Sequence, residues 1–264
     1  MRFVKAILVL ALTVPGWAQT VTIVQPDVAG LELIGWQSPE FQASLDAALG
    51  PQVIGQLGAW VPYTVVLKNN SAEALAAYQM QWSANGTTAG TGLGSASPGP
   101  NFILKPGDAL VFLPGLEVAT HMAVDLPTRL LQRNMTMQLA SLGKMKAVVI
   151  SLDSVVFASG RFVGPDKQEN FARDVAQFAA GRTVDVELQS KLAAGDSYDS
   201  IASWLSEIAN QPIAGGPRAT RDWNTEFQIT EARHLLRRLQ GSGAPAVLKL
   251  VQQQLQAPAI TVHR

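Results

Sequence analysis

The residues that could do chemistry in this chain are few and widely spaced. His121, His234 and His263 are its three histidines. None of them stands in an H-x-H or H-E-x-x-H arrangement, which would bring two imidazoles to one zinc ion. The serines supply neither the G-x-S-x-G turn of an α/β-hydrolase nor an S-x-x-K followed by the other β-lactamase elements. We therefore predict no metal site and no serine hydrolase of a known motif.

Acidic pairs are also poor candidates for a cation site. Asp185 with Glu187, and Asp196 with Asp199, supply oxygen ligands close together in the sequence. An EF-hand loop, however, needs ligands at alternate positions, a central glycine and a final glutamate. Helix caps and solvated helix faces explain these acids better, and we predict that they have structural roles.

Asp153 lies within the most apolar run of the chain, Ala147 to Phe157, which predicts a central strand. A carboxylate inside a buried strand needs hydrogen bonds or a cation, because an unpaired charge in an apolar interior is costly. Asp153 is thus either a ligand or catalytic acid, or a surface-facing or turn-bonding residue beside Ser154. No second carboxylate or histidine stands at a supporting distance in the sequence, so we favour the second interpretation.

The segment Gly90 to Gly94 has the glycine content of a phosphate-binding loop. The dinucleotide fingerprint requires its glycines between a strand and the start of a helix, and the prolines that follow, Pro98 and Pro100, oppose such a helix. We expect the whole segment from 83 to 100 to be a long mobile connection.

A basic strip is predicted on the last two helices. It could dock to an acidic protein, lipid headgroups or a cell-wall polymer, but a solvated face balanced by Glu226 and Glu231 is the interpretation we favour. The strip consists of Arg233, Arg237, Arg238 and Lys249.

The first eighteen residues predict export. Arg2 and Lys5 make a basic start, Ala6 to Val14 is an apolar run, and small residues up to Ala18 suit a signal peptidase. The alternative is an uncleaved anchor, but the run falls short of the roughly 20 residues that cross a bilayer. We expect cleavage after Ala18 and a mature protein that begins at Gln19.

Composition constrains the compartment and the partners. The chain has no cysteine, so its stability must come from a core rather than from disulfides, which favours a Gram-negative periplasm or bacterial surface over a eukaryotic extracellular setting. Without Arg2 and Lys5, 18 basic residues face 20 acidic ones. This balance gives no indication of a nucleic-acid partner.

The composition of the sequence before about residue 165 predicts strands and turns, because short runs of valine, isoleucine, tyrosine and threonine alternate with glycine and proline. A helix is expected over 38–50, and 125–141 is either a helix or an irregular crossover. One hairpin is predicted from strands 62–68 and 75–82 around the turn Asn69-Asn70-Ser71, and another from 102–104 and 109–113 around 105–108. Opening strands are expected over 20–24 and 31–34.

Residues after 165 predict helices, because apolar residues recur at helical spacing between capping residues and glycines. The last two helices should form an antiparallel hairpin around Gly241 to Gly243, and the tail from Pro258 to Arg264 should be frayed. The expected helices cover 166–181, 184–195, 197–210, 225–239 and 241–255.

Two stretches of the sequence are similar to those of other proteins. The stretch from Leu152 to Asp166, which includes Gly160-Arg161-Phe162-Val163-Gly164-Pro165, and the earlier stretch from Val65 to Tyr78 resemble uncharacterised secreted bacterial proteins. The resemblance implies a secreted β-sandwich and no known activity.

These observations predict an α+β protein with a signal peptide over 1–18, an antiparallel immunoglobulin-like β-sandwich over 19–165 and an α-helical region over 166–264. We expect a secreted or periplasmic binding or envelope-associated module without catalytic activity, cofactor or metal. Its expected partner is another envelope or extracellular protein or polymer, with no nucleic acid and no stable membrane insertion. The alternative is a secreted hydrolase with a dispersed site, in which a carboxylate or histidine would show a strongly perturbed pKa inside a cleft.

Overall fold

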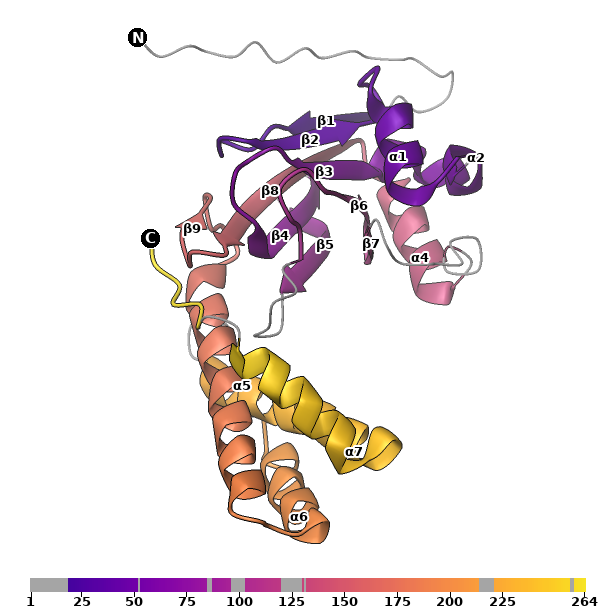
Figure 1. The fold of residues 1–264 in the computed structure, drawn as a ribbon. Helices are drawn as coiled ribbons and strands as arrows, with labels where there is room; N and C mark the ends of the chain where they lie inside the picture. Colours follow the sequence, from indigo (N-terminus) through magenta and orange to yellow (C-terminus); the bar gives the residue numbers. More distant parts are fainter. Residues whose placement is uncertain are drawn as a thin grey trace. The chain divides into compact units, whose positions relative to one another are not determined.

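A computed structural model gives the fold of the protein (Figure 1). It describes residues 19–51, 53–84, 87–95, 103–119, 130, 132–213, 221–256 and 259–264. The expected leader, residues 1–18, lies outside these ranges. The architecture is α+β as predicted, with sheets in the N-terminal part of the chain and helices in the C-terminal part.

The chain divides into two compact units. The division between Asp153 and Ser154 falls inside a strand, so it does not coincide with the change of composition near residue 165. The sheet unit consists of Met1–Ala74, Tyr78–Leu93 and Leu104–Asp153, and the helical unit consists of Leu75–Ala77, Gly94–Ile103 and Ser154–Arg264.

The first sheet is built around β8, Ala147–Phe157, whose bounds are those that the apolar run predicts. The strand order is β1-β8-β4-β5, with β9 paired to β8 beside this path. β1 lies parallel to β8, so this sheet is mixed and the prediction of a purely antiparallel fold is wrong here. Every residue of β8 from Leu152 to Phe157 is buried. Burial on both faces is what a continuous apolar strand requires. The other strands are β1 (Thr20–Val24), β4 (Leu75–Ala84), β5 (Thr87–Ser95) and β9 (Phe162–Val163).

The second sheet is antiparallel and has the order β2-β3-β6-β7. Its hairpin is made by β6 and β7, because Pro114 and Gly115 form a two-residue turn that pairs Leu113 with Leu116. The predicted hairpin of 102–104 with 109–113 is therefore wrong: the second of these segments is β6, which pairs with β3 and β7. The strands are β2 (Leu31–Gly35), β3 (Val65–Asn69), β6 (Ala109–Leu113) and β7 (Leu116–Ala119).

The predicted hairpin of 62–68 with 75–82 is also wrong, although both strands exist. β3 belongs to the second sheet and β4 to the first. All but one residue of β4 are buried, so both faces of this strand are covered. Alternation along a sequence identifies the faces of a strand but does not identify its neighbours, and the turn at 69–74 connects two sheets instead of two paired strands.

Asn69 holds this connection together. The side chain is fully buried, and its amide donates to the carbonyl oxygens of Glu73 at 2.8 Å and Leu104 at 3.2 Å. Its side-chain oxygen accepts from the backbone N–H of Ser71 at 3.0 Å and from the Ser71 hydroxyl at 2.6 Å. The Asn69 side chain thus supplies hydrogen-bond partners to backbone groups of Ser71, Glu73 and Leu104.

Asn69→Ala is expected to lower the free energy of unfolding by roughly 2 to 3 kcal/mol, because buried partners would lose their hydrogen bonds. Urea denaturation measures this. Asn70→Ala is the matched control, since Asn70 is exposed and makes one side-chain bond to Glu32 at 3.3 Å; it should change stability by less than about 0.5 kcal/mol. Equal losses for the two variants would contradict the role given to Asn69.

The expected mobile connection over 83–100 is wrong where the structure describes it. Thr87–Ser95 forms β5, which pairs with β4, and the glycines from Gly90 to Gly94 lie within this strand. Backbone hydrogen bonds of a neighbouring strand can hold a glycine-rich segment whose own residues have low strand propensity. A strand conformation also excludes the phosphate-loop geometry.

Helices flank the sheets of the sheet unit. α1 (Phe41–Leu49) confirms the helix expected over 38–50 and buries Phe41, Leu45 and Ala48. Within the ambiguous range 125–141, the structure places a helix, α4 (Arg133–Leu142), while 120–129 lies outside the described residues. Two short segments follow α1, namely α2 (Val53–Leu57) and the 3-10 helix η1 (Gly58–Tyr63).

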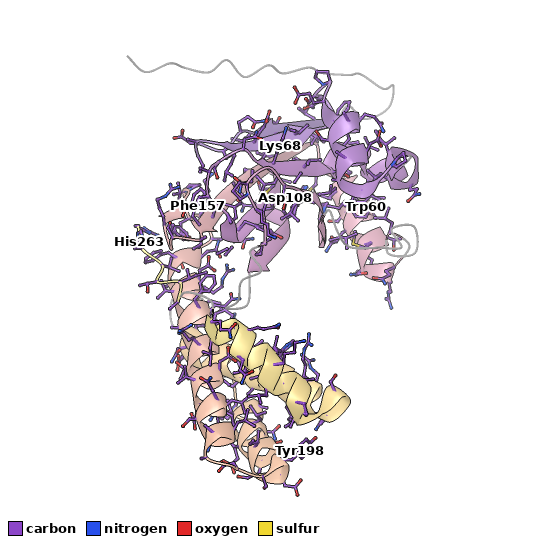
Figure 2. The ribbon with its side chains drawn as sticks, viewed as in Figure 1. Trp60, Lys68, Asp108, Phe157, Tyr198 and His263 are labelled. Atoms are coloured by element: carbon purple, nitrogen blue, oxygen red, sulfur yellow. The ribbon has the colours of Figure 1, made fainter. Side chains whose placement is uncertain are left out.

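Side chains of both sheets meet in the core of the sheet unit. The ring of Tyr78 on β4 packs edge-on against Phe112 on β6, with ring centroids 5.0 Å apart. Trp82 on β4 is fully buried, and its indole N–H donates to the carbonyl oxygen of Tyr63 at 2.9 Å. Trp60, on the 3-10 helix, is also buried (Figure 2). These aromatic contacts connect the two sheets.

Three helices form most of the helical unit: α5 (Asn170–Ala193), α6 (Tyr198–Ala209) and α7 (Trp223–Gln256). α5 continues through Gly181, where one helix was expected to end, because packing against α7 outweighs the low helix propensity of glycine. Ser197 caps α6 as predicted and accepts from the Ser200 N–H at 3.2 Å. α7 has a kink at Gly243, whose φ of 78° is not helical, so the expected turn at 241–243 is confirmed there.

Two apolar clusters stabilise the helical unit. One lies between the three helices; the other lies where the end of β8, β9, α5 and the segment 259–264 meet. The buried members of the first are Val184, Leu188, Ile201, Leu205, Ala209, Ala232, Leu235, Leu239, Val247 and Val251. The buried members of the second are Ala76, Ala77, Val156, Phe162, Phe178 and Val262.

Candidate functional site

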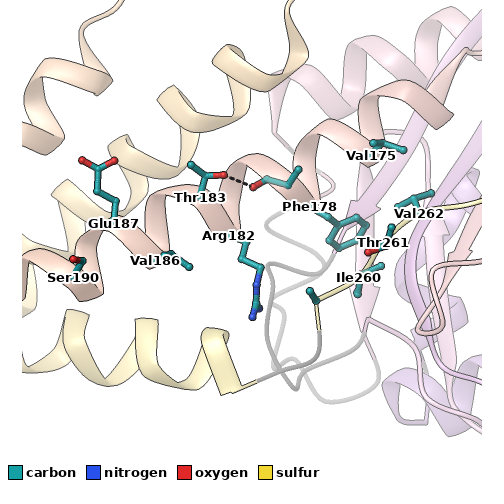
Figure 3. A pocket seen from close by; sticks show the side chains of 12 residues that line it. Val175, Phe178, Arg182, Thr183, Val186, Glu187, Ser190, Ile260, Thr261 and Val262 are labelled. Atoms are coloured by element: carbon teal, nitrogen blue, oxygen red, sulfur yellow. Dashed lines mark hydrogen bonds between the residues drawn. The ribbon is translucent and has the colours of Figure 1, made fainter. Parts of the chain in front are cut away.

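A cavity of about 710 Å³ lies in the helical unit, between α5 and the segment 259–262 (Figure 3). This volume falls within the range of roughly 300 to 1,000 Å³ that small ligands and peptide side chains occupy. Its lining residues, most of them apolar, come from α5 and from that one segment. They are Val175, Phe178, Ala179, Arg182, Thr183, Val186, Glu187, Ser190, Ala259, Ile260, Thr261 and Val262. We call this cavity the α5 groove.

The walls of the α5 groove are unusual for a solvated helix. Val175 is 37% exposed and Val186 is 50% exposed, although an amphipathic helix normally turns such side chains toward the core. The hydroxyl of Thr183 donates to the carbonyl oxygen of Ala179 at 2.9 Å, so its proton is directed toward the helix backbone. Arg182 and Glu187 supply the charges of the lining. The groove is therefore an apolar surface with one cation and one anion.

The segment 259–264 is fixed in place instead of frayed as predicted. The N–H of His263 donates to the carbonyl oxygen of Gly160 at 2.8 Å, and the N–H of Phe162 donates to the carbonyl oxygen of His263 at 2.7 Å. Arg161 and His263 form a parallel bridge. Val262 is buried in the second apolar cluster. One wall of the α5 groove is thus a segment that is held by backbone hydrogen bonds at His263 and by the burial of Val262.

Gly160 makes this docking possible. Its φ is 91°, and a Cβ at this position would overlap with the carbonyl oxygen of Thr261. Only glycine combines this backbone conformation with so close an approach of another chain segment. The sequence marks this position as a turn, and the structure shows that the glycine also receives the 259–264 segment.

Arg264 fastens the same segment to the start of α5. Its guanidinium forms an ion pair with Asp166 and lies 4.7 Å from the ring centroid of Phe171. Asp166 also accepts from the backbone N–H of Asn170 and of Phe171, so its side chain satisfies the first N–H groups of α5, which begins at Asn170 and not at 166 as predicted. A single carboxylate connects the helix start to the segment that forms the groove wall.

A buried carboxylate pair lies on the facing helices α5 and α7. Asp185 is fully buried, and neither of its oxygens has a hydrogen-bond partner among the described residues. Burial raises the pKa of Asp185 to about 7, the nearby Glu231 adds to this rise, and the Arg182 guanidinium opposes it. Burial raises the pKa of Glu231 to about 7 as well. Like charges in one apolar site favour the protonated forms.

Glu231 and His234 also line a small cavity of about 210 Å³ between α5 and α7. Burial lowers the pKa of His234, and the cations of Arg238 and Arg237 lower it further. A carboxyl that titrates near neutral pH beside a neutral imidazole is a combination suited to proton transfer. The volume is below that of the usual ligand sites, so it would admit only a small part of a substrate.

The structure corrects the sequence interpretation of these acids. Asp185 is neither a cap nor on a solvated face, and Glu231 does not balance a surface strip. The signal that could have found them is helical spacing: Asp185 stands four residues after Gly181 and Glu231 four residues before Leu235, on the stripes that the helices bury. Asp199, in contrast, lies in the first turn of α6, as the cap interpretation expects.

Asp153, His234 and His263 belong to different parts of the fold. Asp153 is 1% exposed, so the expectation of a surface-facing residue is wrong; it is engaged by neighbouring groups. It lies where both faces of β8 are covered. His263 is in the segment beside Arg161, His234 is on α7, and His121 lies outside the described residues.

All four residues of the basic strip are exposed, as the solvated-face interpretation predicts, but two of them also have local partners in the helical unit. Arg233 donates to the carbonyl oxygen of Ala209 at 2.9 Å, which satisfies the C-terminal end of α6. Arg237 lines the small cavity beside Glu231. Glu226, expected to balance the strip, instead approaches Arg221 at 3.4 Å. The strip is therefore partly a structural element of the helical unit.

A buried ion pair lies near the start of α5. Arg173 and Asp174 contact each other, and both side chains are almost fully buried. Burial raises the pKa of Asp174, and Arg173 opposes the rise. Asn170, one turn earlier, donates to the hydroxyl of Ser154 at 3.4 Å. The hydrogen bond between Asn170 and Ser154 connects the start of α5 to β8.

The sheet unit has a cavity of its own, of about 520 Å³, between α1 and the strands β3 and β6. It is lined by small side chains of α1 together with three charged residues, Glu40, Lys68 and Asp108. Its lining has no large apolar residue beyond Val66, so it offers less apolar surface to a ligand than the α5 groove does.

Two properties of the described ranges concern metal ions and membranes. Among those residues, no three histidine, cysteine or acidic side chains stand close enough together to hold a metal ion. None of the described helices is both long enough and apolar enough to span a bilayer.

No protein-family model, curated protein or solved structure matches this chain.

Proposed function

We propose that the protein is an exported binding module without catalytic activity, and that its ligand site is the α5 groove. The observation that carries the proposal is the groove itself, which combines exposed valines on a helix with an ordered wall from residues 259–262. A solvated helix gains nothing from exposing such side chains, whereas a ligand that covers them gains from their burial.

Export is the part of the proposal that rests on the sequence. The basic start, the apolar run of 6–14 and the small residues up to Ala18 support cleavage before Gln19. The lack of cysteine supports a bacterial envelope, because the chain depends on its two cores instead of disulfides. An envelope or extracellular protein or polymer is the proposed class of partner.

We further propose that the sheet unit is an immunoglobulin-like sandwich. The edge-on contact of Tyr78 and Phe112, one from each sheet, supports it, as does the burial of nearly all of β4. Two sheets that interdigitate through such side chains form the core of a sandwich. In this proposal the sheet unit is a scaffold and the helical unit carries the binding site.

Site-specific photo-crosslinking tests the binding function. A benzoylphenylalanine at position 186 places the reactive group in the α5 groove, and the same residue in place of Ile213, which is 43% exposed outside the groove, is the matched control. With the chain produced in a Gram-negative host, we expect a mature protein that begins at Gln19 and an adduct from position 186 only. A chain that keeps Met1, or equal adducts from the two positions, would count against the proposal.

One observation favours a hydrolase as the second candidate. Glu231, with a pKa of about 7, and His234 line one cavity, which is the perturbed pair expected of a dispersed acid–base site. Against it, Asp185 is fully buried and the cavity is small. The carboxylate pair therefore fits a structural role in the interface of α5 and α7 better than a role in substrate binding.

A further inference from the structure

The segment 259–263 has one hydrogen-bonded edge and one open edge. The N–H and C=O of His263 both bond to the chain at 160–162. Successive residues of an extended segment direct these groups to opposite sides, so those of Val262 face away, and those of Ile260 do the same. Within the described ranges, no hydrogen bond reaches the backbone of Ile260 or Val262.

The α5 groove runs along this open edge. Four consecutive residues, from Ala259 to Val262, line it. Side chains alternate between the two faces of an extended segment, so a cavity against one face would be lined by every second residue. Because consecutive residues line the α5 groove, the cavity lies beside the open edge of the segment, where another extended chain would lie.

The opposite wall suits the side chains of such a chain. Figure 3 shows Phe178 beside Ile260 and Val262, while Val186 lies further along α5. A strand added beyond 259–262 would pass over this part of the helix and direct its side chains on one face toward the apolar surface that Ala179 and Val186 supply. Backbone bonds to the open edge and pockets for alternate side chains are the two elements of peptide recognition by strand addition.

The charges of the groove support a peptide as its occupant. Arg182 and Glu187 give the lining one cation and one anion. A peptide with one acidic and one basic side chain complements both of them. An acyl chain with one anionic headgroup would complement Arg182 only and would leave the open backbone edge without partners.

We propose that the α5 groove binds an extended peptide of a partner protein, which adds as a strand to the open edge of residues 259–263. The peptide has apolar residues at alternate positions toward α5. This inference rests on the proposed binding function and specifies its ligand class.

A phage-displayed library of random heptapeptides, panned on the full mature chain, tests the proposal. We expect enriched peptides with alternating apolar residues. Ile260→Pro removes one outward N–H, and it should weaken their binding at least tenfold. Methylation of alternate backbone nitrogens in an enriched peptide should weaken the binding of that peptide by a similar factor. Ile213→Pro makes the same replacement at an exposed isoleucine outside the groove and should leave binding unchanged.

Hydrogen exchange separates the loss of the Ile260 N–H from a displacement of the whole segment 259–264. The His263 N–H bonds to Gly160, so its protection shows whether the segment remains docked in Ile260→Pro. Full binding to a docked Ile260→Pro chain, or full binding of the methylated peptide, would overturn strand addition, as would a library without enriched peptides. If position 186 still yields its adduct in such a case, the binding function stands and only the ligand class fails. If the adduct is absent too, both proposals fail.

Discussion

Asp185→Asn is expected to stabilise the folded chain by about 4 kcal/mol at pH 8 and to have little effect near pH 4. The pKa of Asp185 rises from 3.8 to about 7 on folding, and one pKa unit corresponds to roughly 1.4 kcal/mol. Asparagine keeps the shape of the side chain and removes the buried charge. The variant therefore keeps the folding free energy that the wild type loses above neutral pH, where Asp185 ionises in a buried site.

The direction follows from proton linkage. Below pH 4, Asp185 is protonated in both the folded and the unfolded chain, and its stabilising contribution is complete. Between pH 4 and 7 the unfolded chain loses the proton and the folded chain keeps it, so stability falls as pH rises. Glu231 acts in the same direction, because its pKa rises from 4.5 to about 7. Above pH 8 the penalty is constant.

Urea denaturation at pH 4.5, 6 and 8 measures this effect. Glu187→Gln is the control, since it removes an acid from the same helix at an exposed position, and it should shift stability by less than about 0.5 kcal/mol at each pH. A wild type whose stability is flat from pH 5 to 8, or an Asp185→Asn chain that is less stable at pH 8, would show that Asp185 is not buried as described.

Gly160→Ala is expected to release the segment 259–264 from the helical unit. An alanine at this φ costs roughly 1 to 2 kcal/mol, and its Cβ would also overlap with the Thr261 carbonyl oxygen. The segment must move away to relieve that overlap. The amides of Phe162 and His263, which bond across this junction, should lose their protection from hydrogen exchange.

Gly195→Ala separates the two causes. Gly195 also has a positive φ, of 80°, but a Cβ there would meet no atom within 4 Å. This variant should show the backbone cost alone, with full protection at Phe162 and His263. If Gly160→Ala kept that protection, the 259–264 segment would not depend on the glycine and would not form a fixed wall of the groove.

The sequence predicts which residues form strands better than it predicts how the strands pair. The bounds of β8 follow from its apolar run, because a central strand buries both faces. The placement of β3 and β4 in different sheets does not follow from the sequence, since a polar turn such as Asn69-Asn70-Ser71 can connect two sheets as well as two neighbouring strands. Only the buried hydrogen bonds of Asn69 distinguish these cases, and they involve Leu104, which is distant in the sequence.

The sequence predicts neither the α5 groove nor the buried carboxylate pair, and each has a physical reason. The 259–264 segment has few residues and no helical or strand pattern, and it is ordered by partners at 160–162 and 166, distant in the sequence. Asp185 was assigned to a solvated face because acids usually are, although its spacing from Gly181 and Leu188 places it on the buried stripe. Periodicity should therefore have outweighed residue type at this position.

One photo-crosslinking measurement decides whether the α5 groove or the buried carboxylate pair is the functional site. Asp185→Asn and Glu231→Gln are combined in the chain that carries the photo-crosslinker at position 186. We expect an undiminished adduct, because these carboxyls affect the stability of the helices but do not bind the ligand. Loss of the adduct from a chain whose circular dichroism and unfolding remain cooperative would contradict this expectation.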